Sequence, residues 1–156
     1  MSLSIKIQRA EIARFARKVK KWEAGLKKEV ADDFAEAAIN IDRNAKLRAP
    51  VNTLVGAGGV LRSGQYFEKR KGGLNYLIGN RVKYAPYQEF GTGRRVSLVE
   101  LVKAGYPSSY ALQFKGKGIR EVNIQPQPFL FPSVNEEVPK TYKRLKETFK
   151  RHGKKF

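Results

Sequence analysis

The sequence predicts an α+β fold in which a long N-terminal helix and a shorter C-terminal helix pack on a small antiparallel β-sheet. Apolar residues recur every three or four positions near both ends of the chain, a spacing typical of amphipathic helices. Between these ends, short apolar runs are separated by turn residues, which is typical of antiparallel strands. With 156 residues, the chain is long enough for one domain with its own core but short for two.

The N-terminal part is predicted to contain an extended arm and two helical segments. Residues 3–7 alternate between apolar and polar, which favours a short strand or arm. A helix face follows, and Gly25 predicts a break after it. The next helix, from about 24 to 48, ends before Pro50 because the residue preceding a proline is pushed out of the helical region. The apolar positions are Ile12, Phe15, Val19 and Trp22, and then Leu26, Val30, Phe34, Ala37 or Ala38, Ile41 and Ala45.

The middle of the chain reads as a loop followed by strands. Residues 51–60 are rich in glycine and are expected to form an exposed, mobile loop. Residues 84–90 fit either a short helix or a strand edge, and their periodicity does not decide between the two. The elements predicted between them are strands at Tyr66-Phe67 and 74–78 joined by a turn at 69–73, a turn at Gly79-Asn80, and a third extended piece at 81–83.

Two capping boxes mark predicted helices in the C-terminal half. Ser97 with Glu100 opens a short helix at 98–104, and Ser133 with Glu136 opens the C-terminal helix. That last helix is expected to kink or to begin near Pro139, because an interior proline costs about 3 kcal/mol. Between the two helices, 111–115 and 119–124 read as a hairpin around residues 116–118. The apolar face of the C-terminal helix contains Val138, Tyr142, Leu145 and Phe149.

The net charge of +18 is concentrated at the two ends of the chain. Residues 1–28 and residues 140–156 each carry +7, whereas residues 29–139 carry only +4. We therefore divide the single domain, residues 1–156, into a basic N-terminal arm at 1–23, a core at 24–150 and a basic tail at 151–156. Polycationic ends favour docking onto DNA, an acidic protein surface or anionic lipid, although a solvated face is the ordinary role of any single lysine or arginine.

The residue inventory argues against an enzyme. The chain has no cysteine, and its one histidine, His152, reads as a solvated tail residue. Zinc fingers, thiol nucleophiles and Ser-His-Asp triads are therefore excluded, and no cofactor or metal is expected. Asp32, Asp33 and Glu36 leave a carboxylate Mg²⁺ site formally open, but a solvated acidic face opposite the apolar stripe is the preferred interpretation.

The sequence also bears on the compartment. The chain contains no apolar run of about 20 residues and no signal-peptide core, and the absence of cysteine fits the reducing cytoplasm of the producing cell. A basic amphipathic helix at 9–22 lying on a membrane is a third idea, but a plain surface helix fits better, so no membrane partner is expected.

Three blocks in fixed order point to a family. The first joins Ala49-Pro50 to Leu61-Arg62, the second runs from Tyr84 to Thr92, and the third is Gln127 to Pro132. Over residues 24–150 this pattern resembles the tail-completion, or neck, proteins of long-tailed bacteriophages. The positions that match the family pattern are Pro50, Leu61, Arg62, Tyr84, Ala85, Glu89, Phe90, Gly91, Thr92, Pro128, Phe129, Leu130 and Pro132.

The chain departs from that family pattern in a few places. Asn52 stands where aspartate is usual, and residues 54–60 lengthen the turn before Leu61. Residues 94–109 form an insertion after the Gly-Thr pair. Phe131 and Ser133 stand where arginine and alanine are more usual.

The resemblance implies a structural subunit of the virion neck, assembled in the host cytoplasm. It implies a homo-oligomeric ring, six-fold as is usual for tail-end parts or twelve-fold where they meet the portal. The neighbours would be neck, adaptor, portal or tail-tube proteins, and double-stranded DNA would pass through the channel with nonspecific contacts. Within the motifs, Glu89 is expected to be a structural anchor, with Arg62 as a candidate partner. Phe129, Leu130 and Phe131, which stand between prolines, are expected to plug the core.

The alternative function is a sequence-independent nucleic-acid-binding protein, driven by the release of counterions from phosphates. The chain shows no helix-turn-helix, RNP or KH motif. Under either function, the candidate contacts to DNA or to a partner are Arg14, Arg17, Lys18, Lys21, Arg94, Arg95, Lys115 and Lys117.

Overall fold

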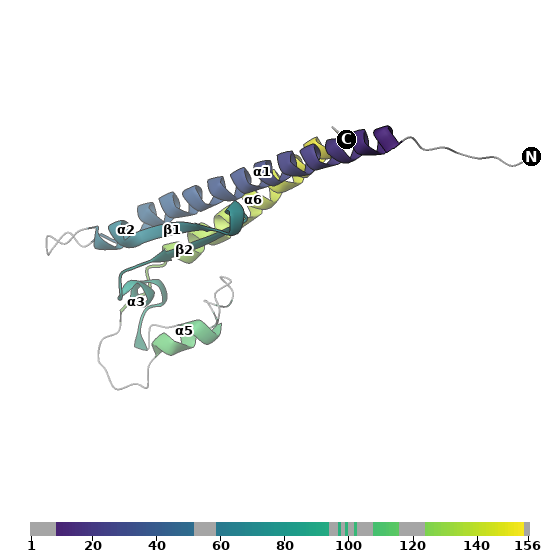
Figure 1. Cartoon of the computed structure of the whole chain (residues 1–156). Helices are drawn as coiled ribbons and strands as arrows, with labels where there is room; N and C mark the ends of the chain where they lie inside the picture. The colour runs from purple at the N-terminus through teal and green to yellow at the C-terminus, as the bar shows by residue number, and fades with distance from the viewer. Residues whose placement is uncertain are drawn as a thin grey trace, which may run out of the picture.

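The computed structural model describes residues 9–51, 59–93, 97, 99, 102, 108–115 and 124–154. Its longest element is α1 (Arg9–Arg48), a helix of 40 residues that is about 60 Å long at 1.5 Å per residue. The second long helix, α6 (Leu130–Gly153), runs antiparallel beside α1, and a β-hairpin lies against the C-terminal half of α1 (Figure 1). This arrangement confirms the predicted α+β class.

The predicted break at Gly25 is wrong, because α1 is continuous through this position. A single glycine inside a helix costs only about 1 kcal/mol relative to alanine, and its neighbours Ala24, Leu26 and Lys27 are strong helix formers. Gly25 also lies against the end of α6, where a Cβ would be 3.4 Å from Cε1 of His152. The start of α1, before Trp22, projects beyond the end of α6 (Figure 1).

The C-terminal helix is confirmed, but the side that packs against α1 is its polar side. The apolar residues Val138, Tyr142 and Phe149 stay 44%, 64% and 54% exposed. A polar row, at the same spacing of three and four, is buried in their place. Its buried members are Ser133, Glu137, Thr141, Thr148 and His152.

The start of α6 also differs from its prediction. The helix begins at Leu130, and Pro139 lies inside it on the exposed side. The predicted capping box is wrong, because Oγ of Ser133 donates to the carbonyl of Phe129 at 2.7 Å and Glu136 forms an ion pair with Arg48. The amides at the start of α6 are bound by a side chain from elsewhere in the chain, so that the helix needs no cap of its own.

The β-hairpin consists of β1 (Gln65–Arg70) and β2 (Asn75–Asn80), joined by the 3-10 turn η1 (Lys71–Gly73). The strands pair antiparallel from Gln65 opposite Asn80 to Arg70 opposite Asn75. The two predicted strands are therefore confirmed, and both are longer than expected. A short helix, α2 (Val60–Gly64), leads into β1.

The chain does not turn at Gly79-Asn80, since both residues lie in β2, and residues 81–83 are not a strand. Asn80 forms the bridge after which the chain leaves the hairpin. Its side-chain nitrogen Nδ2 donates to the carbonyl of Leu61 at 2.7 Å, and its side-chain oxygen Oδ1 accepts from the backbone amide of Val82 at 2.9 Å. Asparagine is typical of turns, but Asn80 instead ends β2 and its side chain binds the neighbouring backbone.

Two further helices complete the described elements. Residues 84–90, which were open between helix and strand, contain the helix α3 (Ala85–Phe90). The hairpin predicted over 111–124 is wrong at its first strand, because α5 (Ser108–Lys115) is a helix. Alanine, leucine, glutamine and lysine dominate residues 111–115, and these are good helix formers.

Several predictions lie wholly or partly outside the described residues. These are the arm at 3–7, most of the loop at 51–60, the second strand of the hairpin at 119–124 up to Ile124, and most of the helix at 98–104, of which Val99 and Val102 are helical. Among the described residues, no helix is both long enough and apolar enough to cross a membrane.

Candidate functional site

The three sequence blocks meet in one small core, which we call the motif junction. Ala49 directly follows α1, Leu61 lies in α2, Ala85 lies in α3, and Phe129 directly precedes α6. With Ala45 they form a buried cluster, and Val82 and Leu130 pack on its edge. Of the three residues expected to plug the core, Phe129 is 2% exposed and lies in it, whereas Leu130 and Phe131 are only half-buried. Segments up to 84 residues apart in the chain are thus joined at one place.

Glu89 fastens the start of α6 to α3. Its Oε2 accepts hydrogen bonds from the amides of Phe129 and Leu130 at 2.9 and 3.0 Å, and its Oε1 accepts one from the amide of Phe131 at 3.0 Å. These are amides that the first turn of a helix cannot satisfy internally. Burial raises the pKa of Glu89, and the three amide hydrogen bonds oppose that rise. Glu89 is therefore the expected structural anchor, but it holds a helix N-terminus, while Arg62 is exposed.

The residues on both sides of Glu89 bind the chain segment that leads into α6. The amide of Thr92 donates to the carbonyl of Ile124 at 3.1 Å, and the amide of Ile124 donates to Oγ1 of Thr92 at 2.9 Å. A third bond runs from the amide of Gln127 to the carbonyl of Gln88 at 2.7 Å. Phe90 is 1% exposed, and its ring centroid lies 5.6 Å from that of Phe131. The second and third blocks are thus held together by both backbone and ring contacts.

Gly91 is the position in this segment where glycine is required. Its φ of 73° with ψ of −171° is a conformation that residues with a side chain rarely adopt. A Cβ there would lie 2.8 Å from the carbonyl oxygen of Ile124 and 2.9 Å from Cδ of Pro126. Both the backbone conformation and the available space therefore exclude a side chain.

We expect Gly91→Ala to lower the free energy of unfolding by about 2–4 kcal/mol, from backbone strain and steric overlap together. The matched control is Gly72→Ala. Gly72 also has a positive φ of 69°, but a Cβ there would meet nothing within 4 Å. The control should cost only about 1 kcal/mol. Urea unfolding of both variants measures the difference, and equal losses would mean that the contact with Ile124 is unimportant.

The other motif residues surround this junction without entering it. Pro50, Pro86 and Pro132 are half-buried, and Tyr84 is 44% exposed. Pro128 is exposed, directly before the buried Phe129. The motif therefore has a buried part that holds three segments together and an exposed part that is free to face a neighbour.

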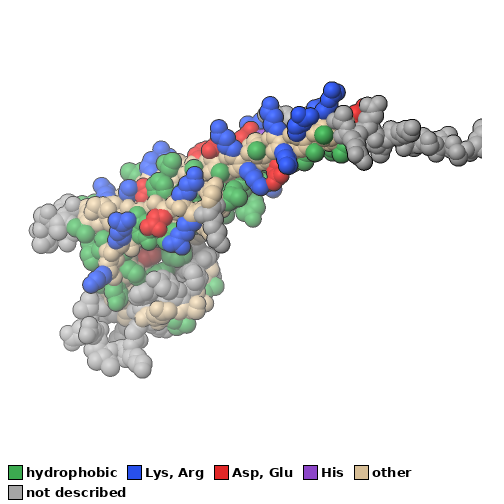
Figure 2. All heavy atoms as spheres, viewed as in Figure 1, with side chains coloured by type: hydrophobic (Ala, Val, Ile, Leu, Met, Phe, Trp, Pro, Cys, Tyr) green, Lys and Arg blue, Asp and Glu red, His purple; other side chains and the backbone are tan. Residues whose placement is uncertain are grey.

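The basic candidates of α1 share one side of its projecting end. Arg14, Arg17, Lys18 and Lys21 are all exposed, and Nε of Arg17 donates to the carbonyl of Ala13 at 3.3 Å. Figure 2 shows lysine and arginine side chains along the projecting part of the long helix. Arg94, Arg95 and Lys117 lie outside the described residues. Lys115 ends α5, but its side chain is not described. Of the candidate contacts, the structure therefore describes the side chains of the four on α1.

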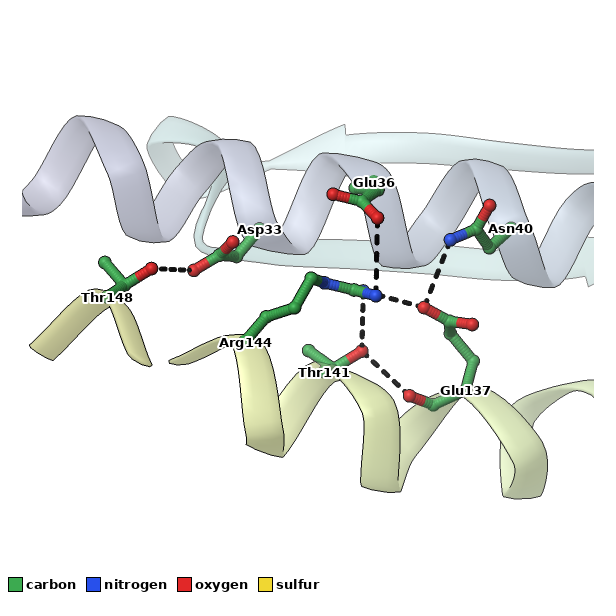
Figure 3. Close-up of polar contacts among 7 residues, drawn as sticks. All are labelled: Asp33, Glu36, Asn40, Glu137, Thr141, Arg144 and Thr148. Atoms are coloured by element: carbon green, nitrogen blue, oxygen red, sulfur yellow. Dashed lines mark hydrogen bonds and ion pairs between the residues drawn. The ribbon is translucent and has the colours of Figure 1, made fainter. Parts of the chain in front are cut away.

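A polar seam joins α1 to α6, and Figure 3 shows the contacts at its centre. At its centre, Nη2 of Arg144 donates to Oε1 of Glu137 at 2.7 Å, and Nη1 lies 3.4 Å from Oε1 of Glu36. The same oxygen of Glu137 accepts from Nδ2 of Asn40 at 3.2 Å. Toward the C-terminus of α6, Oγ1 of Thr148 donates to Oδ2 of Asp33 at 2.8 Å. Sequence reasoning missed this seam, although its polar residues on α6 repeat at helical spacing.

The seam corrects the interpretation of the acidic cluster on α1. The expected solvated face opposite the apolar stripe is wrong for Asp33, which is half-buried and accepts a hydrogen bond from Thr148 of α6. The side chain of Glu36 stays 56% exposed, as expected, although it forms an ion pair with Arg144. Asp32 is exposed, as expected. Among the described residues, no group of three or more metal-ligating side chains could hold a metal ion.

The end of the seam is built around His152, which is not a solvated tail residue. It is 5% exposed, and its Nε2 lies 2.7 Å from Oε1 of Glu29. Nε1 of Trp22 donates to the backbone carbonyl of His152 at 3.0 Å. The prediction failed because α6 continues to Gly153 and lays its last turn on α1. The contact with His152, followed by a bond from Arg151, lowers the pKa of Glu29.

This contact should weaken in acid. Because the pKa of Glu29 in the folded chain lies below its ordinary value of 4.5, its stabilising effect is present above pH 4.5 and is lost as the pH falls through the folded value. Trp22 is the chain's single tryptophan, so we expect its fluorescence to change over that acidic range. Glu29→Gln should remove this transition, and a transition that persists unchanged in the variant would assign it to another group.

A comparison with protein families identifies the chain. A family model described as "Bacteriophage HK97-gp10, putative tail-component" matches residues 13–91, half of the chain. The chain belongs to the HK97-gp10-like family. Searches of curated proteins and of solved structures gave no match.

The HK97-gp10-like match covers α1 from its projecting end, the hairpin and α3 up to Gly91. It therefore includes the first block and the second block up to Gly91, with Glu89, while the third block and α6 lie beyond it. Glu89 thus lies inside the matched region, whereas the three amides that it binds, at residues 129–131, lie outside it. Membership agrees with the resemblance to phage neck proteins and makes the chain a phage tail component.

Proposed function

We propose that this chain is a tail-completion, or neck, subunit that joins the head and the tail of a long-tailed phage. In this proposal, copies repeat as a ring around the DNA channel, six-fold or, on the portal side, twelve-fold. The role is assembly and not turnover. The observation that carries the proposal is the family match to a tail component over residues 13–91.

The surface of the chain supports a role in assembly. Several large apolar side chains are more than half exposed, among them Ile12, Tyr142 and Phe149 at 54%, 64% and 54%. Tyr142 and Phe149 are seven positions apart and so share one side of α6, and exposed apolar surface of this kind is typical of protein–protein contact sites. A subunit that is completed only by its neighbours explains why these side chains are left outside its own core.

The basic side of α1 supports contact with a negatively charged partner. Arg14, Arg17, Lys18 and Lys21 are exposed together on a helix that projects from the rest of the fold. In a neck, either the DNA in the channel or an acidic neighbouring protein would face these side chains. DNA contact through phosphates alone would be nonspecific and would weaken steeply as salt rises.

The proposal is tested by sedimentation of phage particles from the producing cell, after nuclease treatment and in high salt. Quantitative mass spectrometry then measures the ratio of this chain to the co-sedimenting proteins. We expect a fixed small copy number in particles that also contain portal or tail-tube subunits. Loss of the chain from every large particle, together with its release by nuclease, would instead identify a free nucleic-acid-binding protein.

A further inference from the structure

An apolar trough of about 450 Å³ lies between α1, β2 and α6. One wall is formed by Val138, Tyr142 and Leu145 of α6, and Leu74 and Ile78 of the hairpin line the other side. The floor is α1, from Phe34 to Ile41. In Figure 2, hydrophobic side chains are exposed along the lower edge of the paired helices α1 and α6. The trough is the surface left open when α6 turns its polar side toward α1.

The spacing of the trough residues suits a third helix. Val138, Tyr142 and Leu145 follow one another at intervals of four and three, which places them in a row on one side of α6. Phe149, four positions further on, continues this row beyond the trough. On the floor, Ala37 and Ala38 are small and buried, so they leave room between Phe34 and Ile41. A row with this spacing, facing a floor of small residues, is the geometry in which helices interdigitate their side chains.

The charged side chains of α6 indicate which kind of helix could bind in the trough. The exposed surface of α6 carries Lys140, Lys143, Lys146 and Lys150, against a single exposed acid, Glu147, in the same stretch. A second copy of the chain, with a net charge of +18, would be repelled by this surface. An occupant with acidic residues beside its apolar ridge would be attracted to it.

We propose that the trough binds an amphipathic helix of a different protein, whose apolar ridge is flanked by aspartate and glutamate. That this protein is another component of the phage particle rests on the neck function proposed above. The binding surface itself follows from the contacts and charges of α1, β2 and α6. Contacts between copies in a ring would then use other surfaces of the chain.

The first test uses the purified full chain and two synthetic amphipathic peptides of 18 residues. Both carry the same leucine ridge, flanked by glutamate in one peptide and by lysine in the other. We expect the glutamate peptide to bind at least ten-fold more tightly than the lysine peptide, and Tyr142→Ser to weaken its binding at least ten-fold. Leu47→Ser is the matched control, because Leu47 is 70% exposed but does not line the trough. Equal binding of both peptides, or an equal effect of the two substitutions, would overturn the proposal.

The second test places a photo-crosslinking amino acid at position 142 of the chain in phage particles. The expected adduct joins position 142 to an acidic, helical segment of another particle protein, and the same residue placed at position 47 should not give this adduct. An adduct to a second copy of the chain, or no adduct in assembled particles, would overturn the proposal and leave the neck function standing. Conversely, peptide binding by a chain that is absent from particles would refute the neck function alone.

Discussion

Glu89→Ala should lower the free energy of unfolding by about 3–5 kcal/mol. The substitution removes the acceptors of three amides at the start of α6, and each buried donor left without a partner costs about 1–3 kcal/mol. Water entering the space left by the side chain will recover part of this cost. Urea unfolding followed by circular dichroism measures the loss, and a change below about 1 kcal/mol would show that these bonds do not hold α6.

Glu89→Gln separates the charge of this side chain from its hydrogen bonds. The amide retains one oxygen and replaces the other with a donor, which would face an amide of the helix start. We expect this variant to lose about 1–3 kcal/mol of unfolding free energy, which is less than the loss in Glu89→Ala. A loss equal to that of alanine would mean that both carboxylate oxygens are essential.

The pH dependence at Glu89 has the opposite sign to that at Glu29. Burial raises the pKa of Glu89, so the folded chain takes up this proton more readily than the unfolded chain does. Its titration therefore adds stability as the pH falls through the folded pKa, and it removes stability as the pH rises. Acid should thus weaken the fold through groups whose pKa is lowered in the folded chain, such as Glu29. The fluorescence of Trp22, which contacts His152, is expected to follow the titration of Glu29.

The second large effect is expected in the polar seam, where Arg144→Met should destabilise the fold by about 3–5 kcal/mol. The substitution leaves Glu137, which is 2% exposed, with only the long bond from Asn40. A buried charge that loses its partner is costly because it has been removed from water without compensation. Thermal or urea unfolding measures the loss.

The double variant Glu137→Met/Arg144→Met is the decisive control for the seam. Replacing both partners with apolar residues removes the uncompensated charge, and such replacements are often neutral or stabilising. We therefore expect the double variant to recover most of the stability that Arg144→Met loses. Lys143→Met, a change at an exposed neighbour, should stay within about 0.5 kcal/mol of the wild type. If the double variant is as unstable as the single one, the charges themselves are needed.

The junction and the seam together explain the exposed surface of the molecule. Glu89 fixes where α6 begins, and the seam fixes which side of α6 meets α1. With both set, Val138, Tyr142 and Phe149 are left facing outward beside α1. The folding of the single chain thus produces the apolar surface that assembly with another protein would use.

The sequence by itself determined the class of the fold, its main elements and the blocks that carry the family resemblance. Long-range helical periodicity, Pro50 and the two apolar runs at 66–67 and 74–78 are local signals, so they could be interpreted residue by residue. The sequence also marked Glu89 and Phe129 as structural residues. It could not name the partner of Glu89, because the three amides lie 40 to 42 positions away.

Only the tertiary structure decided which side of α6 is buried. Periodicity shows that Val138, Tyr142 and Phe149 share a face, but burial depends on what the opposite helix offers. Here α1 offers Asp33, Glu36 and Asn40 to α6, so the polar row that includes Arg144 and Thr148 gains hydrogen bonds and ion pairs by turning inward. His152 was misjudged for the same reason, since its partner Glu29 lies 123 positions earlier in the chain. Pairing between distant polar groups is a property of the folded chain, and no local pattern encodes it.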